Sequence, residues 1–300
     1  MFRRLLPFAF ATLIAVASPA LASFDDIEVS PRLRGVGSTG VATLDDAYAP
    51  LRNPSALAWA DGASGAFSYL QPFSLEFATQ NAVTASIPLP GAAGGIGIGI
   101  RTFGVRYLGE TLDQEETFTF AHGFRLLHDT QSELAFGWSV SLMTLSFGTS
   151  VTSLDPGQAS TVGFSVGAIA TVRDRTRVGF VVQNLNSPKI GDHDYENIPR
   201  RLAGGLVYEP YAGVTAMLDM RADLGETIGY RGGVELNATD FLKLRAGIAT
   251  EPNVFSAGLG LRIRGHLQLD YAFSSGGGVL SETHHVGLEL HAPTPWERGP

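Results

Sequence analysis

The sequence contains no cysteine, little charge and no long apolar run beyond its first residues. Without cysteine the chain forms no disulfide and uses no thiol in catalysis. Only 17% of its residues are charged, against about 25% in an average protein. Its formal net charge of -8 argues against a nucleic-acid partner, which usually meets a basic surface. No apolar run of about 18 residues follows the N-terminal segment, so helical membrane spans are excluded.

Residues 1–22 have the three parts of a secretory signal peptide. Arg3 and Arg4 precede an apolar stretch over residues 5–16, and small residues follow as far as Ala22. We therefore predict a signal peptide over 1–22, cleavage after Ala22, and a mature chain outside the cytosol.

The stretch RGVGSTG, residues 34–40, has the glycine spacing of a dinucleotide-binding loop at Gly35, Gly37 and Gly40. Such a loop needs a hydrophobic strand before the glycines and a helix after them. The preceding residues, Val29-Ser30-Pro31-Arg32, contain a proline and fit no strand. We expect no cofactor, and we interpret the glycines as positions of tight turns and close backbone approach.

From about residue 65 onward the sequence alternates between apolar residues and small or polar ones. In 132–142 the even positions from Leu134 onward are large and apolar and the odd positions from Ala135 onward are alanine, glycine or serine, and 161–172 repeats the pattern. Alternation with a period of two predicts strands with one apolar face. The same signal predicts further strands at 65–71, 74–87, 94–107, 115–126, 176–184, 201–209, 213–223, 228–237, 241–249, 254–264, 266–273 and 283–291.

In the later strands the second face carries real charges. A soluble β-sandwich would show similar alternation. The export signal, strands of about nine to twelve residues and aromatic residues near segment ends favour a transmembrane antiparallel β-barrel of about 14 strands, an all-β fold. Charged residues would then face the lumen and pair across strands. The predicted lumen-facing polar residues are Arg221, Arg231, Glu235, Lys243, Arg245, Arg262, Asp270, His285 and Glu289.

Two predicted strands change phase internally. The apolar set shifts between Ile100 and Phe103 in one strand, and between Leu142 and Leu145 in the other. A one-residue slip would turn every side chain to the opposite face. Each change therefore predicts a bulge, a bend or the end of the bilayer segment.

The segment GVGSTGVATLDDAYAPLRNPSALAWA, residues 35–60, predicts two short helices before the first strand. Thr43 precedes Asp46 by three residues, as in a helix cap, and Asn53 precedes Pro54, which suits a first helical position. The segment resembles the N-terminal part of FadL-like and PorV/PorQ-like outer-membrane barrels, although it reads Asn-Pro-Ser where the commoner form is Asn-Pro-Ala. The matching residues are Gly37, Gly40, Ala42, Asp45, Asp46, Ala47, Asn53, Pro54, Ala56 and Leu57.

The resemblance implies a short helical luminal plug or hatch over 23–62, a barrel over 63–291 and a C-terminal tail over 292–300. The tail ends without the final aromatic residue usual in such barrels. The gate or plug residues would be Gly37, Gly40, Asp45, Asp46, Asn53 and Pro54.

The FadL side of the resemblance implies passive transport of a hydrophobic small molecule, of the fatty acid or hydrocarbon class, across the bacterial outer membrane. The PorV side implies the alternative, a non-enzymatic scaffold or shuttle for exported proteins, as in type IX secretion. The expected partners are accordingly outer-membrane lipid and either a hydrophobic ligand or an exported protein.

Candidate chemical groups are few. Asp192, His193 and Asp194 lie in a polar loop, where solvated residues are expected. His285 and Glu289 would be about 13 Å apart along one strand and could not share one ion. Nothing in the spacing selects a serine partner for His285. We therefore expect no catalytic residue, no metal site and no enzymatic activity.

Overall fold

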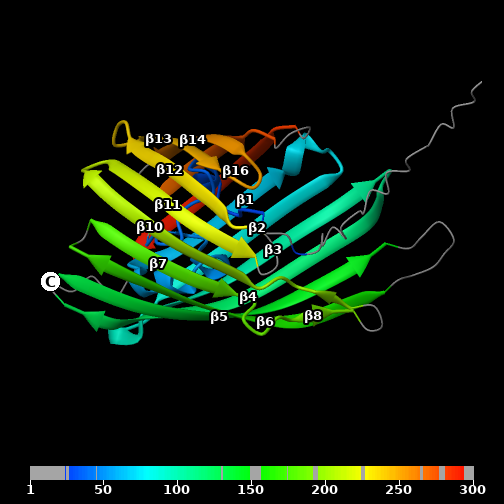
Figure 1. Cartoon of the computed structure of the whole chain (residues 1–300), viewed down its shortest axis with the longest axis horizontal. Coiled ribbons are helices and arrows are strands. Elements are labelled where there is room, and N and C mark those ends of the chain that lie inside the picture. Colours follow the sequence, from blue (N-terminus) through cyan, green and yellow to red (C-terminus); the bar gives the residue numbers. More distant parts are fainter. Residues whose placement is uncertain are drawn as a thin grey trace, which may run out of the picture.

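Antiparallel strands close into a barrel in the computed structural model of this chain (Figure 1). The structure describes residues 24, 27–44, 46–129, 131–148, 157–173, 175–191, 195–223, 227–263, 266–276 and 281–293. The predicted signal peptide, Asp45, the 192–194 trio and residues 294–300 of the tail lie outside them. Within these ranges, no helix combines the length and the apolar character needed to cross a membrane.

Fourteen of the described strands form the wall, each beside its neighbours in sequence order, and the first pairs with the last. They coincide with the segments that alternation predicts, so the all-β barrel is confirmed. A small sheet of β8 (Lys189–Ile190) and β9 (Glu196–Asn197) lies outside the wall order. The wall strands are β1 (Gly62–Gln71), β2 (Ala78–Pro88), β3 (Gly95–Tyr107), β4 (Glu110–His128), β5 (Ser132–Phe147), β6 (Gln158–Val172), β7 (Thr176–Gln183), β10 (Arg201–Tyr211), β11 (Val214–Asp223), β12 (Gly229–Asn237), β13 (Leu242–Ala249), β14 (Val254–Ile263), β15 (Leu267–Ser274) and β16 (Thr283–Pro293).

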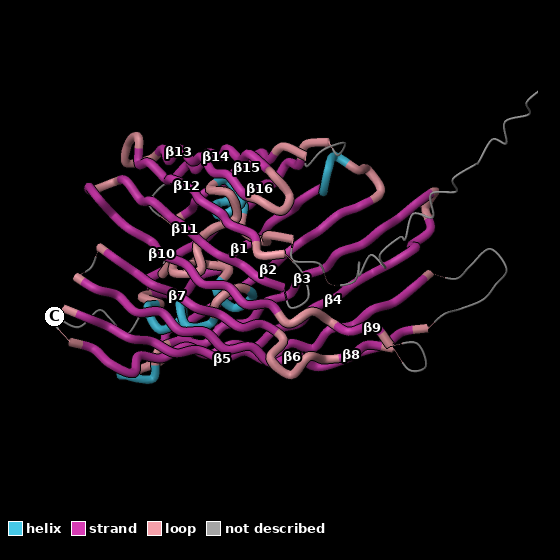
Figure 2. Tube along the Cα trace, in the orientation of Figure 1, coloured by secondary structure: helices cyan, strands magenta, loops and turns pink. Residues whose placement is uncertain are grey.

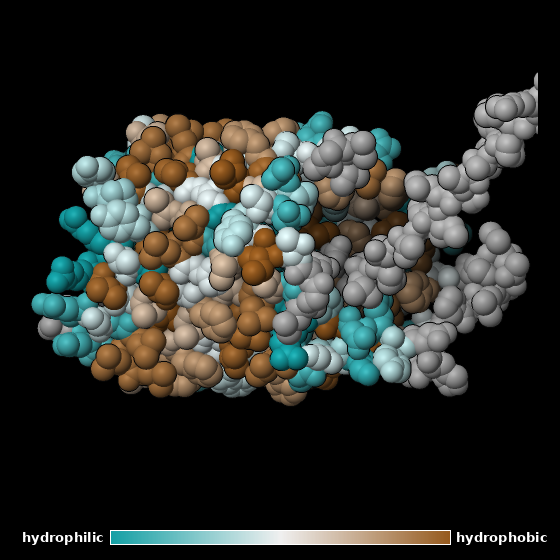
Figure 3. Space-filling model, viewed as in Figure 1, coloured by the Kyte–Doolittle hydropathy of each residue, from teal (hydrophilic) through white to brown (hydrophobic). Residues whose placement is uncertain are grey.

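The outer face of the wall is an apolar belt to which every wall strand contributes. Figure 3 shows apolar residues on one side of this outer face. Soluble monomers rarely expose a continuous apolar surface of this extent. A sandwich would bury its apolar face between two sheets, whereas here one closed sheet turns it outward. Exposed members of the belt, one from each wall strand, are Phe67, Val83, Ile98, Phe118, Leu142, Phe164, Phe180, Leu206, Leu218, Val234, Leu244, Leu259, Leu269 and Val286.

The structure has no bulge at either change of phase, whereas the end of the bilayer segment at these two positions stays a prediction. β3 pairs with β2 without a shift from Gly95 to Val105, and β5 pairs with β6 in register throughout. The apolar residues beyond each change therefore face the lumen, where Met143 and Leu145 are buried. Beside β5 the lumen is apolar at this height, because Met143 and Leu145 pack with Phe24, Ile190 and Ile198. A register shift does occur in β3, but farther along, between Val105 and Arg106.

The two ends and the two halves of the barrel differ. β3 to β6 have 13 to 19 residues, whereas β7 and the later wall strands have 8 to 11, so one side of the wall is taller (Figure 1). At the end where Gly62 meets Pro293, short connections such as 212–213 and 238–241 join the strands. At the other end the chain leaves β5 and β7 for its longer connections, and the described residues 184–191 and 195–200 belong to the second of these.

Three short helices of the N-terminal segment lie inside the barrel, where Figure 2 shows them enclosed by the wall. They are α1 (Pro31–Gly35), η1 (Ala49–Leu51) and η2 (Pro54–Trp59). Helix α1 contacts β13 to β16, and η2 contacts β2 to β6. Two further short helices, η3 (Pro72–Ser74) and η4 (Gly91–Ala93), form turns between wall strands.

The helix starts follow the predicted signals only in part. Asn53 caps η2, its Oδ1 accepting from the Ser55 amide at 3.2 Å, with Pro54 in the first turn. Thr43 caps nothing, because its hydroxyl has no hydrogen-bond partner among the described residues. Helix α1, which Ser30 caps and Pro31 begins, was not predicted.

Candidate functional site

A buried ionic network fixes α1 to the wall. Arg32 donates to both carboxylate oxygens of Glu235, at 3.0 and 2.9 Å. Arg245 bridges Glu235 at 2.6 Å to Asp270, and Gln268 also donates to Asp270 at 2.7 Å. All five residues are less than a tenth exposed. Removing a single partner from such a network leaves a buried charge uncompensated, so the network holds α1 rigidly.

The glycine-rich turn after α1 is bound by a wall carboxylate. Asp219 on β11 accepts from the amides of Gly40 at 2.7 Å and Val41 at 3.1 Å. Gly37 and Gly40 have φ angles of 76° and 113°, backbone conformations that residues with a Cβ rarely adopt. A Cβ at Gly37 would lie 2.7 Å from the Ile248 carbonyl oxygen. The glycine spacing therefore serves a tight turn against the wall and needs no phosphate.

Two further arginines tie this part of the plug to the wall. Arg34 of α1 donates to His285 Nδ1 at 3.2 Å, and Arg231 of β12 donates to the Ser38 carbonyl at 3.2 Å. Burial lowers the pKa of Arg34 to about 10. We call residues 31–42 the first plug segment. Charged groups connect it to the wall strands β11, β12 and β16.

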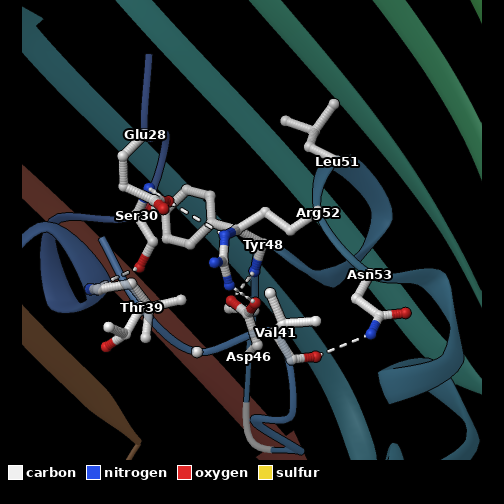
Figure 4. A network of polar contacts seen from close by, with 12 residues as sticks. Glu28, Ser30, Thr39, Val41, Asp46, Tyr48, Leu51, Arg52 and Asn53 are labelled. Atoms are coloured by element: carbon white, nitrogen blue, oxygen red, sulfur yellow. Dashed lines mark hydrogen bonds and ion pairs between the residues drawn. The ribbon is translucent and has the colours of Figure 1, made fainter. Parts of the chain in front are cut away.

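Residues 46–57, which we call the second plug segment, are held by charges within the plug itself (Figure 4). Arg52 forms ion pairs with Glu28 at 3.1 Å and with Asp46 at 2.9 Å. Burial lowers the pKa of Arg52, but these two carboxylates outweigh burial and the net shift is upward. The Tyr48 hydroxyl donates to the Phe67 carbonyl of β1 at 3.0 Å. The ion pairs of Arg52 thus join residues of the plug to one another and include no residue of the wall.

Helix η2 lies against a part of the wall that lacks side chains. A Cβ at Gly137 would lie 2.2 Å from the Ser55 amide nitrogen, and one at Gly167 would lie 2.0 Å from Asn53 Oδ1. The Asn53 side chain also donates to the Val41 carbonyl at 2.8 Å, linking the two plug segments (Figure 4). Glycine in the wall therefore leaves the room that the second plug segment fills.

Phe24 lies at the far end of the lumen, near the longer connections. Its ring joins a buried apolar cluster with Met143 and Leu145 of β5, together with Ile190 and Ile198. Its amide donates to Glu115 at 2.8 Å, and Arg201 donates to its carbonyl at 2.7 Å. The wall thus binds both the side chain and the backbone of this residue.

Two cavities lie on either side of the second plug segment. One, of about 110 Å³, lies between Pro50, Arg52 and the tall wall, and reaches Phe24 and Arg201. The other, of about 160 Å³, is lined by Ala47 and Leu57 and reaches Gly62 and His291 at the end with short connections. Residues 46–57 therefore separate two spaces that lie on different sides of the plug.

The predicted site residues fall into several groups rather than one. Glu235, Arg245 and Asp270 share the network of α1, while Arg231 and the Gly37–Gly40 turn adjoin it. Asp46, Asn53 and Pro54 belong to the second plug segment. Arg221 lines the first cavity, and Glu289 is buried in the lumen 3.6 Å from His291. His285 is buried, Lys243 half-buried, and Arg262 exposed at the end of β14.

Sequence reasoning missed Phe24, Glu28, Arg32, Arg52 and Asp219 as parts of this site. Only Asp219 gave a signal, as a charge on the wet face of an alternating strand. Among the described residues, no three histidine, aspartate or glutamate side chains are placed to hold a metal ion.

Comparison with known proteins shows similarity of fold only. No family model matches the chain, and no curated protein matches it in sequence. Its fold is similar to that of the monoaromatic hydrocarbon channel CymD, with a TM-score of 0.64 and 12% identity over 91% of this chain and 100% of that one. The fold is also similar to that of the Pseudomonas putida toluene transporter TodX, with a TM-score of 0.57 and 14% identity over 86% of this chain and 95% of that one. A Pseudomonas aeruginosa FadL homologue has a TM-score of 0.56 and 12% identity over 88% of this chain and 98% of that one.

At the level of the fold, these structures support the resemblance to FadL-like barrels. None of them points to the PorV/PorQ side, so the scaffold for exported proteins is not carried forward.

Proposed function

We propose that this protein is a passive channel of the bacterial outer membrane for small hydrophobic molecules, closed by its own N-terminal segment. The observation that carries the proposal is the second plug segment, which separates two luminal cavities inside a barrel with an apolar outer face. The similarity in fold to CymD and TodX, a hydrocarbon channel and a toluene transporter, supports the choice of cargo.

The ends of the barrel support an orientation. Outer-membrane barrels have short periplasmic turns and longer extracellular loops. The end with Gly62 and Pro293 would therefore face the periplasm, and the end with Phe24 and the 184–200 connection would face the outside. The cavity near Phe24 would receive the cargo, and the cavity near His291 would release it.

The second plug segment is the part we assign to gating. Its ion pairs, between Arg52 and the carboxylates of Glu28 and Asp46, stay within the plug, so displacing it need not break an ion pair with the wall. Displacement of residues 46–57 would join the two cavities into one path. Asn53, Pro54 and Asp46 would then act as gate residues, as the resemblance implies, and Gly37 and Gly40 would hold the part that stays. Asp45 lies outside the described residues.

The test is uptake of labelled toluene by cells whose outer membrane carries the protein, compared with the same cells without it. Faster uptake with the protein supports the channel. The variant Arg52→Met removes both ion pairs and should raise uptake severalfold, whereas Arg173→Met, at an exposed turn outside both cavities, should not change it. Equal uptake with and without the protein, when it is found folded in the outer membrane, would overturn the proposal.

A further inference from the structure

The cavity that reaches His291 is large enough for an aromatic ring while the plug stays in place. It measures about 160 Å³, and an apolar cavity of about 150 Å³ holds a benzene molecule. The cavity near Phe24 measures about 110 Å³, so it would accept a ring only after a side chain moved. The closed barrel therefore has room for a small ring on one side of the second plug segment only. We call the larger space the Trp59 cavity, after a residue of its lining.

The plug side of the Trp59 cavity is apolar. Leu44, Leu57 and Trp59 all line it. The same three residues belong to an apolar cluster that includes Ala121 of β4 and Ile169 of β6. The apolar lining of the cavity is thus continuous with packed core, which holds it in shape. Preformed cavities with such a lining bind small molecules mainly by burying their apolar surface.

The indole of Trp59 is fixed in place by two residues of the wall. Its Nε1 donates to the carboxylate of Glu133 on β5. The guanidinium of Arg125 on β4 lies over the ring, 5.7 Å from its centroid. Two aromatic rings in offset or edge-to-face contact gain free energy beyond the burial of their surface. A fixed indole in the lining therefore favours an aromatic ligand over an aliphatic one of equal size.

The polar groups of the lining already have partners within the protein. The Ser64 and Ser86 hydroxyls bond to each other at 2.7 Å, and Asp46 accepts from Arg52 at 2.9 Å. A ligand without polar groups therefore leaves none of these groups unsatisfied. Among the described residues that line the cavity there is no lysine or arginine, whereas Asp46 and the exposed Asp61 are both acidic. A carboxylate ligand would meet charges of its own sign without a guanidinium in the lining to pair with.

From its volume, its apolar lining and its charge we infer that the Trp59 cavity is a binding site for a single molecule of a monocyclic aromatic hydrocarbon, of the size of benzene or toluene. The ligand lies against Trp59 on the side of the plug that the proposed orientation turns to the periplasm, and it binds while the plug is closed. The inference rests on the proposed function for the route by which the ligand arrives. It also narrows the cargo, because a fatty acid such as octanoate is too large for about 160 Å³ and carries the disfavoured charge.

The first test reads the fluorescence of Trp59 itself. The chain has 3 tryptophans, so in Trp138→Phe/Trp296→Phe only Trp59 emits. Toluene should change this emission and saturate it, at the same concentrations at which equilibrium dialysis against protein-free micelles shows bound toluene. Octanoate at equal concentration should leave the emission unchanged. Bound toluene without any change in Trp59 emission would overturn the site, and octanoate binding as tight as that of toluene would overturn the ligand class.

Two variants locate the site by changing its size. Ala60→Leu, at a half-buried position of the lining, fills the cavity and should weaken toluene binding about tenfold or more. Ala92→Leu, exposed at the same end of the barrel and outside both cavities, is the matched control. Leu44→Ala enlarges the cavity and should admit naphthalene, which the parent excludes. Toluene binding that Ala60→Leu leaves unchanged would overturn the placement, as would exclusion of naphthalene by folded Leu44→Ala.

The toluene uptake assay separates this inference from the proposed function. Protein-dependent uptake of toluene without a response of Trp59 would refute the Trp59 site and leave the channel in place. Saturable binding of toluene at Trp59 without faster uptake by cells that carry the folded protein would refute the channel and leave the site.

Discussion

The two plug segments fill the same lumen but are held there by different interactions. In the first, residues 31–42, Arg32 and the amides of Gly40 and Val41 bond to wall carboxylates. In the second, residues 46–57, the ion pairs of Arg52 join plug residues only. This segment contacts the wall by packing against glycine and by neutral hydrogen bonds, such as the one that the Thr84 hydroxyl donates to the Ala47 carbonyl. The difference suggests that one inserted segment can combine a fixed part with a movable part.

Breaking the network of the first segment should have the largest effect. Glu235→Leu leaves Arg32 and Arg245 without their shared carboxylate and should lower the free energy of unfolding by about 3–5 kcal/mol. Unfolding of the purified protein in urea, followed by the loss of β-sheet circular dichroism, measures this. A variant as stable as the parent would show that the network does not hold α1.

Filling the glycine wall should displace the second segment. A Cβ at Gly167 would lie 2.0 Å from Asn53 Oδ1, so Gly167→Val should cost about 1–3 kcal/mol and raise toluene uptake. Gly104→Val, whose Cβ would meet only the Asp113 carbonyl at 3.9 Å, is the matched control. Unchanged uptake in folded Gly167→Val would argue against residues 46–57 as the gate.

Removing the cap of η2 should have a smaller effect. Asn53→Ala loses the bond to the Ser55 amide and the bond to the Val41 carbonyl, and it should destabilise η2 by about 1 kcal/mol. Toluene uptake should rise less than in Gly167→Val. An effect larger than that of Gly167→Val would place the closure at the link between the two segments instead.

Sequence periodicity was sufficient for the wall, because each strand places apolar residues on a single outer face. The plug contacts could not be predicted in this way. Arg32 meets Glu235 across 203 residues of sequence, and neither residue carries a local signal of the other. The same limit applies to the change of phase in β5, since Leu145 turns inward to a cluster that includes Phe24. Helix α1, with five residues, is too short for periodicity to reveal.

The most direct test of a fixed and a movable part is hydrogen exchange of the unaltered protein in lipid, read by mass spectrometry. The account predicts faster exchange for the amides of residues 46–57 than for those of 31–42, because the Gly40 and Val41 amides bond to Asp219 of the wall, whereas the Tyr48, Leu51 and Ala56 amides bond within the plug. Equal protection of both segments, or faster exchange in residues 31–42, would contradict it.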